Sequence, residues 1–193
     1  MALIEIQFGL FKGKKLKYPD RIALRPSLAR VRDVLFNWLG NLSHKKCLDL
    51  FAGTGILGIQ SLCLGAEYVD FVEADRPLAD ALKIHLETMR FSTCAHVTYG
   101  LAAHFLKNIK NHPKIYDIIF LDPPFDNLTL LDDLWAILPM LCNDSTIIYL
   151  EHPKNIPFKA PCDFRYEFIY LKNKQIGEVS IYLIQYRRKA NTG

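Results

Sequence analysis

Short apolar segments alternate with helical patterns over most of this chain, and this alternation constrains the fold more than any other feature. The expected strands are 47–51, 68–72, 96–99, 116–121 and 146–150, and the expected helices are 77–89, 102–110 and 128–141, with another that ends near residue 64. Continuous apolar strands that alternate with helices indicate a parallel sheet covered on both faces. With 193 residues, of which 50% are hydrophobic, the chain can bury the core of one main α/β domain.

The two ends of the chain depart from this alternation. The first 24 residues look like a short β-hairpin or meander, and a helix follows from about residue 25, because apolar residues there recur at helical spacing. At the other end, 164–171 and 176–185 flank a polar segment with no helix between them. This pattern predicts an antiparallel hairpin that closes the sheet and turns at 172–175.

Composition narrows the possible classes. No apolar run approaches the roughly 18 residues that a bilayer span needs. The N-terminus has no basic region followed by an apolar stretch, so no signal peptide is expected. The five cysteines are widely spaced, none forms a C-x-x-C pair, and the histidines share no ligand spacing. We therefore expect no metal site, and reduced thiols in the cytoplasm fit best.

Positive charge is concentrated at the start of the chain. Residues 1–46 hold ten Lys and Arg against three Asp and Glu, whereas the formal net charge of the whole chain is only +4. A basic N-terminal arm on a mildly acidic body is typical of a protein that binds a polyanion with one face. A solvated, lysine-rich surface would give the same charge pattern, so both interpretations stay open.

The segment DLFAGTG, residues 49–55, indicates a glycine loop between a strand and a helix. Glycine at 53 and 55 permits φ > 0 and lets a ligand approach the backbone closely. Ligands of open parallel sheets bind at the carboxyl ends of the strands. Glu73 ends the next strand, where a carboxylate can accept hydrogen bonds from both hydroxyls of a ribose, and Asp75 is the alternative acceptor. The segment therefore predicts a nucleoside-bearing cofactor.

Two cofactors fit this loop. Gly53, Gly55 and Gly58 match the G-x-G-x-x-G fingerprint of dinucleotide binding, so NAD stays possible. Two features favour S-adenosylmethionine. Asp49 precedes the glycines, where a carboxylate suits a cationic methionine moiety better than a pyrophosphate, and nothing downstream resembles a site of hydride transfer. A tight turn without any ligand is the remaining alternative.

The segment DPPF, from Asp122 to Phe125, follows the most apolar of the expected strands. Its two prolines fix φ and remove two backbone donors, so the turn presents carbonyls and the Asp122 carboxylate. Such a surface of acceptors suits an –NH2 group and steers the nitrogen lone pair toward an incoming methyl group. Phe125 can stack on a base. The turn therefore predicts methylation of a nucleobase amine, although Asp-Pro-Pro can also begin an ordinary loop.

Three longer segments resemble one known family. RPSLARVRDVLFNWL, LDLFAGTGILGIQSLCLGAEYVDFVEADR and IIFLDPPF are similar to segments of the bacterial 16S ribosomal RNA guanine-N2 methyltransferases that act on guanine 966. The resemblance implies the class I methyltransferase fold. This is an α/β fold with a mostly parallel seven-stranded sheet, helices on both faces, a C-terminal antiparallel hairpin and, here, a small N-terminal arm of hairpin and helix. It also implies S-adenosylmethionine as the cofactor and N2-methylguanine as the product.

The resemblance also implies roles for single residues. The guanine amine would be held by Asp122, Pro123, Pro124 and Phe125. Residues 49–55 would hold the methionine part of the cofactor, Glu73 the ribose and the Ala102 N–H the adenine ring, which gives the expected set Asp49, Phe51, Gly53, Gly55, Glu73 and Ala102.

Phosphate contacts are expected from the basic arm. We divide the chain into 1–44, an RNA-binding hairpin and helix, and 45–193, the methyltransferase domain. The expected phosphate-binding residues are Lys12, Lys14, Lys15, Lys17, Arg21, Arg25, Arg30 and Arg32. The expected partner is 16S ribosomal RNA or an assembly intermediate of the small subunit, bound by a cytoplasmic monomer without a membrane.

One departure from the family pattern leaves alternatives open. The family usually has Asp or Asn just before the alanine that corresponds to Ala102, and this chain has Leu101. A side-chain acceptor for the adenine amine is therefore missing. The chain could also be a ribosome-assembly RNA binder that has lost cofactor affinity, or a methyltransferase of adenine or cytosine amines in DNA or RNA. Glu151 and His152 end a strand at the same edge of the sheet and could line the pocket.

Overall fold

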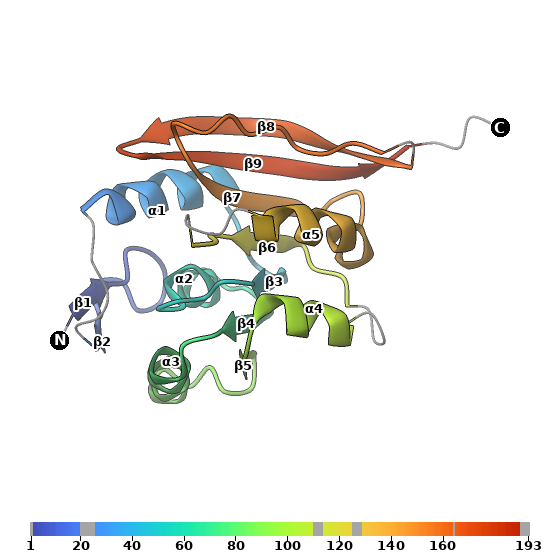
Figure 1. Ribbon diagram of the computed structural model, residues 1–193. Helices are drawn as coiled ribbons and strands as arrows, with labels where there is room; N and C mark the ends of the chain where they lie inside the picture. Colours follow the sequence, from blue (N-terminus) through green and yellow to red (C-terminus); the bar gives the residue numbers. More distant parts are fainter. Residues whose placement is uncertain (1, 20–25, 110–113, 125–128, 164, 190–193) are drawn as a thin grey trace.

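The computed structural model describes residues 2–19, 26–109, 114–124, 129–163 and 165–189 (Figure 1). The strands are β1 (Ala2–Glu5), β2 (Lys15–Tyr18), β3 (Lys46–Asp49), β4 (Tyr68–Glu73), β5 (Ala95–Tyr99), β6 (Ile118–Leu121), β7 (Ile147–Pro153), β8 (Tyr166–Ile176) and β9 (Val179–Arg188). The helices are α1 (Pro26–Leu39), α2 (Ile56–Cys63), α3 (Arg76–Thr88), α4 (Ala102–Ile109), α5 (Thr129–Ile137) and the 3-10 helix η1 (Leu138–Leu141). None of the described helices has the length and apolar character that a membrane crossing requires.

Seven of the described strands form one sheet in the order β5-β4-β3-β6-β7-β9-β8. The five strands from β5 to β7 are parallel, and β9 and β8 close the sheet as an antiparallel hairpin. Strand order reverses between β3 and β6, and ligands of open parallel sheets bind at such a point, outside the carboxyl ends of the strands. The topology therefore predicts a ligand site among the residues that follow β3 and β6.

Helices cover both faces of the sheet (Figure 1). On one face, α1, α2 and α3 pack with the hairpin of β1 and β2 around a core that includes Phe71, Phe120 and Tyr149. On the other face, α4, α5 and η1 pack around Leu121 and Ile148. Side chains alternate between these two cores along each strand, because successive residues of a strand point to opposite faces. The expected parallel sheet with two covered faces is confirmed.

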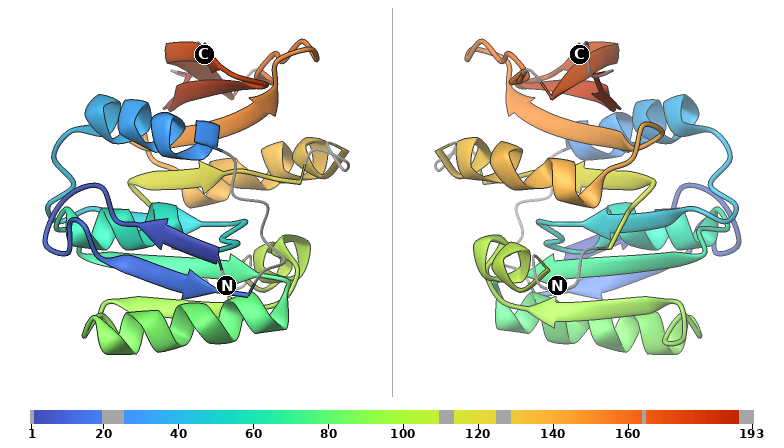
Figure 2. Two further views of the ribbon diagram at one scale, coloured as in Figure 1. Left: turned by 90° about the vertical axis from the view of Figure 1, so that its left-hand side faces the viewer. Right: turned by 90° about the vertical axis from the view of Figure 1, so that its right-hand side faces the viewer.

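The N-terminal hairpin packs directly on the main domain. It lies on the α2 and α3 side of the sheet in both views of Figure 2. The Gln60 side chain of α2 accepts hydrogen bonds from the backbone N–H groups of Gln7 and Phe8 and donates one to the Phe8 carbonyl. A Cβ at Gly9 would lie 2.0 Å from the Cys63 carbonyl oxygen, so glycine is required for this approach. The arm and the domain therefore share one hydrophobic core.

The C-terminal hairpin differs from expectation in the position of its turn. Lys172, Lys174 and their neighbours belong to β8, and the turn falls at Gly177, whose φ is +60°. Residues 171–175 are exposed, so their polarity marks a solvated strand rather than a turn. A bulge between Tyr170 and Lys172 shifts the register of β8 against β9. The turn was expected too early, at 172–175, because a run of polar residues was taken to indicate a reversal of the chain.

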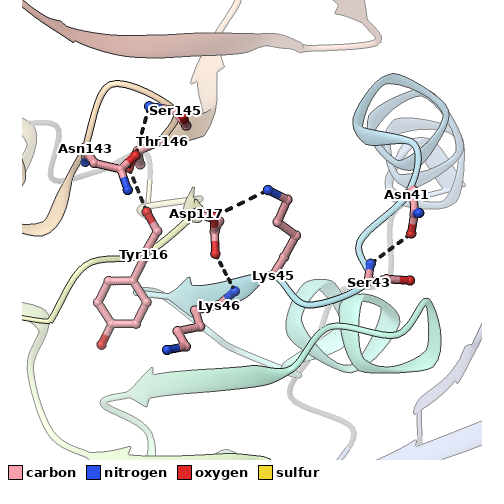
Figure 3. Close-up of polar contacts among 9 residues, drawn as sticks. All are labelled: Asn41, Ser43, Lys45, Lys46, Tyr116, Asp117, Asn143, Ser145 and Thr146. Carbon is pink, nitrogen blue, oxygen red and sulfur yellow. Dashed lines mark hydrogen bonds and ion pairs between the residues drawn. The ribbon is translucent and has the colours of Figure 1, made fainter.

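Polar contacts fix the amino ends of the central strands (Figure 3). The Asp117 carboxylate, just before β6, accepts hydrogen bonds from the Lys46 backbone N–H at 2.8 Å and from Lys45 Nζ at 3.4 Å. The Thr146 hydroxyl, just before β7, donates to the Tyr116 carbonyl at 2.7 Å. These contacts tie β3, β6 and β7 together at the edge opposite their carboxyl ends. They fix the register of these strands from their amino ends, and the residues at the carboxyl ends are not needed for this purpose.

Candidate active site

The glycine loop lies where the sequence placed it, between β3 and α2. Gly53 and Gly55 have φ of +53° and +68°, which glycine adopts without strain. A Cβ at Gly53 would have no heavy atom within 4 Å, whereas a Cβ at Gly55 would lie 2.4 Å from a methyl group of Leu82. Gly53 therefore leaves open space in which a ligand can approach the backbone, and Gly55 lets the loop pack against α3.

Gly58 has a different role from the two loop glycines. A Cβ at this position would lie 2.2 Å from the Phe71 ring, so glycine lets α2 pack closely on β4. Its N–H donates a hydrogen bond to Asp49 Oδ2 at 3.1 Å. The third glycine of the G-x-G-x-x-G pattern thus serves helix–strand packing and says nothing about which nucleoside cofactor binds.

Asp49 is a buried carboxylate directly behind the loop. Its side chain is 2% exposed. Burial raises its pKa to about 7, the Gly58 N–H opposes this rise, and the nearby charge of Glu73 adds to it. Removing a carboxylate from water disfavours its charged form unless a cation or donors compensate. A cationic ligand at the carboxyl end of β3 would therefore stabilise the ionised form of Asp49.

Glu73 ends β4 beside the loop, as expected. Its Oε2 accepts a hydrogen bond from the Gly53 N–H at 2.5 Å, and its Oε1 accepts one from the Asp75 N–H at 2.6 Å. Asp75 Oδ1 accepts from the Leu78 N–H at 3.0 Å and so caps α3. Capping satisfies an orphan N–H of the helix, so both carboxylates already accept backbone hydrogen bonds. Glu73 is the one that contacts the glycine loop directly, through the Gly53 N–H.

The Asp-Pro-Pro turn begins where β6 ends, on the strand next to β3. Asp122 is partly exposed, Pro123 is buried and Pro124 is exposed, while Phe125 lies outside the described residues. Asp49 pairs with Phe120 on one side and with Phe71 on the other. The turn, the glycine loop and Glu73 therefore lie at the carboxyl ends of three neighbouring strands. Ala102, the first residue of α4, follows β5 at the same edge, and Leu101 before it is 54% exposed.

Tyr18 contacts this site although the sequence analysis did not single it out. Its hydroxyl donates a hydrogen bond to the Thr54 carbonyl of the glycine loop, and its buried ring lies 4.9 Å from the His85 ring of α3. The only sequence signal was alternation in β2, where Leu16 and Tyr18 face inward and the lysines face outward. The N-terminal hairpin thus supports the cofactor loop with its inner face.

The basic residues of the arm fall into three groups. Lys12, Lys15, Lys17 and Arg30 are exposed, and Lys14 is partly exposed with its Nζ 5.3 Å from the centre of the Phe11 ring. Arg32 is only 8% exposed, and burial lowers the pKa of its guanidinium. Arg21 and Arg25 lie outside the described residues. Because a phosphate contact needs an accessible cation, the hairpin lysines and Arg30 are better placed for it than Arg32.

The family model described as conserved hypothetical protein 95 matches residues 4–185. The chain belongs to this family. It is 36% identical to ribosomal RNA small subunit methyltransferase D of Haemophilus influenzae over 189 residues, which covers 94% of this chain and 93% of the relative. It is also 36% identical to the Escherichia coli protein of that name, over 77% of this chain and 74% of the relative.

Solved structures give the same assignment. A structure described as the putative methyltransferase yhhF of Escherichia coli has a TM-score of 0.83 at 32% identity and covers 97% of this chain and all of its own. The putative methylase HI0767 of Haemophilus influenzae has a TM-score of 0.76 at 34% identity, over 95% of this chain and 98% of its own. The expected class I methyltransferase fold and the family resemblance are confirmed, and the chain is a methyltransferase.

Proposed function

We propose that this chain transfers a methyl group from S-adenosylmethionine to the N2 amine of a guanine in 16S ribosomal RNA. One observation carries the proposal. The glycine loop and the acceptor-rich Asp122 turn lie at adjacent strand ends, in a chain whose relatives at 36% identity are named ribosomal RNA small subunit methyltransferase D. The first element suits a nucleoside cofactor, and the second suits an amine.

The residues around the loop fit S-adenosylmethionine better than NAD. The open space at Gly53 lets a ligand approach the backbone, and the buried carboxylate of Asp49 suits a cation rather than a pyrophosphate. We assign the methionine part to residues 49–55, including Phe51, the ribose to Glu73 and the adenine ring to the Ala102 N–H. When bound, the cofactor supplies an electrophilic methyl group.

The Asp122 turn positions the amine and favours charge build-up on its nitrogen. Proline at 123 and 124 removes two backbone donors, so Asp122 and the turn carbonyls accept hydrogen bonds from the –NH2 group. Both hydrogens then point toward the turn, which steers the nitrogen lone pair away from it. Catalysis by such a site consists of positioning and preorganised electrostatics, without an activated nucleophile. We assign the base itself to a stacking contact with Phe125.

The N-terminal arm is our proposed RNA contact. In β2, Lys15 and Lys17 face outward while Tyr18 faces the glycine loop, so phosphate contacts would lie on the outer side of a hairpin that borders the cofactor site. Residues 1–44 would bind RNA and residues 45–193 would perform the chemistry. We further propose that the protein acts as a cytoplasmic monomer, on free 16S ribosomal RNA or on an assembly intermediate.

Purified protein tests this function directly. It is incubated with isotope-labelled S-adenosylmethionine and unmodified 16S ribosomal RNA, and the RNA is then digested and analysed by nucleoside mass spectrometry. Label in N2-methylguanosine is the expected result. Label in a methylated adenine or cytosine would replace the guanine assignment by another base amine. Binding of RNA without any transfer would instead favour an assembly factor.

The raised pKa of Asp49 predicts a pH dependence of cofactor binding. Asp49 is mostly protonated below pH 7 and ionised above it. A sulfonium cation binds the ionised form better, so the Kd for S-adenosylmethionine should fall as pH rises through 7, by up to about tenfold per pH unit. Calorimetry on the unsubstituted protein and on Asp49→Asn checks this. The α-amino group of the cofactor titrates in both, so the difference between the two curves isolates Asp49. Identical curves would contradict the assignment.

Leu101 predicts a gain of affinity on substitution. It is exposed beside Ala102 and offers no acceptor for an adenine amine. Leu101→Asp should tighten binding of S-adenosylmethionine by about 0.5–1.5 kcal/mol, the net contribution of one hydrogen bond. Leu101→Val, which restores no acceptor, is the matched control in the same calorimetric titration. No gain, or a loss, would show that the amine is satisfied by another group.

A further inference from the structure

Glu151 lies beside Asp122 at the carboxyl edge of the sheet. β6 and β7 are parallel neighbours (Figure 1), and their last paired residues are Leu121 and Leu150. Asp122 and Glu151 come next along these two strands. Adjacent strands are about 4.8 Å apart, so the two carboxylates occupy neighbouring places along the edge.

Both carboxylates belong to the same face of the sheet. Residues two apart in a strand share a face, so Glu151 lies on the face of Tyr149 in β7, and Asp122, the first residue after β6, continues the alternation from Phe120. The rings of Phe120 and Tyr149 lie 6.2 Å apart in the core on the α1 side. Burial raises the pKa of Tyr149 well above its usual value, and the charges of Glu151 and Asp122 add to this rise. Asp122 is therefore close enough to act on the Tyr149–Glu151 pair. His152, by contrast, packs on the other face, with its ring 5.3 Å from that of Phe158.

The Glu151 carboxyl group is held by one oxygen and leaves the other available. The Tyr149 hydroxyl donates to Oε1 at 2.6 Å. Among the described residues, Oε2 has no hydrogen-bond partner. The side-chain atoms there that are both unpaired and fully buried are Gln7 Oε1 and Arg32 Nε, and Glu151 Oε2 is not one of them. Oε2 is therefore not fully sealed from solvent, although Glu151 as a whole is 3% exposed. Asp49 and Glu73 are covered to a similar degree, at 2% and 9%.

We propose that Glu151 determines specificity for guanine by accepting the N1–H of the target base, next to the N2 amine that Asp122 and the proline turn hold. This inference rests on the proposed function. The N1–H and N2–H groups of guanine are adjacent donors on one edge of the base, and two neighbouring acceptors match that edge. Adenine and cytosine carry an unprotonated ring nitrogen beside their amine, and this nitrogen would face the ionised Glu151 carboxylate with no proton between them.

A guanine analogue separates this role from a structural one. 2-Aminopurine keeps the amine at position 2 but has an unprotonated N1 and lacks O6. The test uses 16S ribosomal RNA ligated from synthetic segments, so that the target position carries guanine or 2-aminopurine. Transfer rates to both RNAs are compared for the unsubstituted protein, for Glu151→Gln and for the exposed control Glu87→Gln. The amide of glutamine can either accept from N1–H or donate to an unprotonated N1.

The unsubstituted protein and Glu87→Gln should prefer guanine over 2-aminopurine, and Glu151→Gln should reduce that preference by roughly 10- to 100-fold, the worth of a hydrogen bond to a charged group. The preference is the ratio of two rates measured on the same variant. A loss of folded protein lowers both rates equally and leaves this ratio unchanged. The same change in preference should appear in binding without turnover. The two RNAs compete for the protein in the presence of S-adenosylhomocysteine, and the fluorescence of 2-aminopurine reports how much of its RNA is bound.

An unchanged preference in Glu151→Gln, whatever its absolute rates, would overturn the proposal and leave Glu151 a structural partner of Tyr149. If the unsubstituted protein methylated no amine in either RNA, the proposed function would fall and this inference with it. Transfer to guanine with an equal rate on 2-aminopurine would overturn only the role of Glu151.

Discussion

Replacing Asp122 by alanine is expected to abolish methyl transfer while affinity for S-adenosylmethionine stays nearly unchanged. Asp122 follows β6, one strand away from the loop after β3 and two strands away from Glu73 at the end of β4, and its proposed partner is the amine rather than the sulfonium. Removing one preorganised electrostatic partner of a transition state costs roughly 10²–10³-fold in rate, and more is expected here because the carboxylate also orients the amine. Single-turnover transfer to 16S ribosomal RNA measures the loss, and calorimetry measures cofactor affinity.

A matched control separates chemistry from folding. Asp80 is an exposed aspartate of α3 that pairs with Arg76 at 3.8 Å, so Asp80→Ala removes a carboxylate outside the site. It should leave transfer unchanged, since exposed ion pairs contribute little to stability. Near-normal turnover by Asp122→Ala would show that the Asp-Pro-Pro turn does not hold the reacting amine.

Neutralising the hairpin lysines is expected to weaken RNA binding and flatten its dependence on salt. Each phosphate contact contributes about 0.7–0.9 to the slope of log K against log salt, so four lost contacts should lower it by roughly 3. The lysines changed together to glutamine are Lys12, Lys14, Lys15 and Lys17. Filter binding or fluorescence anisotropy over a range of salt concentrations measures the slope, and calorimetry should show unchanged affinity for the cofactor.

The control for the arm removes the same charge elsewhere. The four exposed lysines changed to glutamine in this control are Lys83, Lys107, Lys159 and Lys189. If the arm binds phosphates, the control should keep most of the salt slope that the arm variant loses. Equal effects of the two variants would mean that only net charge matters, and an unchanged slope in the arm variant would place the RNA face elsewhere.

The elements that carry the site could be predicted because local pattern and global fold agree there. β3, the glycine loop and α2 follow one another directly along the chain, and each has a clear sequence pattern. β6 is apolar at every position because both faces of the sheet are covered. Gly53 was recognisable because its position requires φ > 0. The strand ends then brought Asp49, Glu73 and Asp122 to one edge, as parallel topology demands.

Other features depend on contacts between distant segments, which the pattern does not encode. Gly58 matches a cofactor fingerprint, yet the Phe71 ring explains it. Arg32 was expected to contact RNA, but it is only 8% exposed, and its Nε has no partner among the described residues. The bond from Tyr18 to the Thr54 carbonyl joins residues 36 positions apart. Only tertiary packing reveals such pairs.

The most direct test of the account is nucleoside mass spectrometry and primer extension on 16S ribosomal RNA from a strain of the source organism that lacks this gene. One N2-methylguanosine should be missing from that RNA, and restoring the gene should return it. A gene that carries Asp122→Ala should not. Ribosomal RNA with the same N2-methylguanosine content in the presence and absence of the gene would contradict the proposed function.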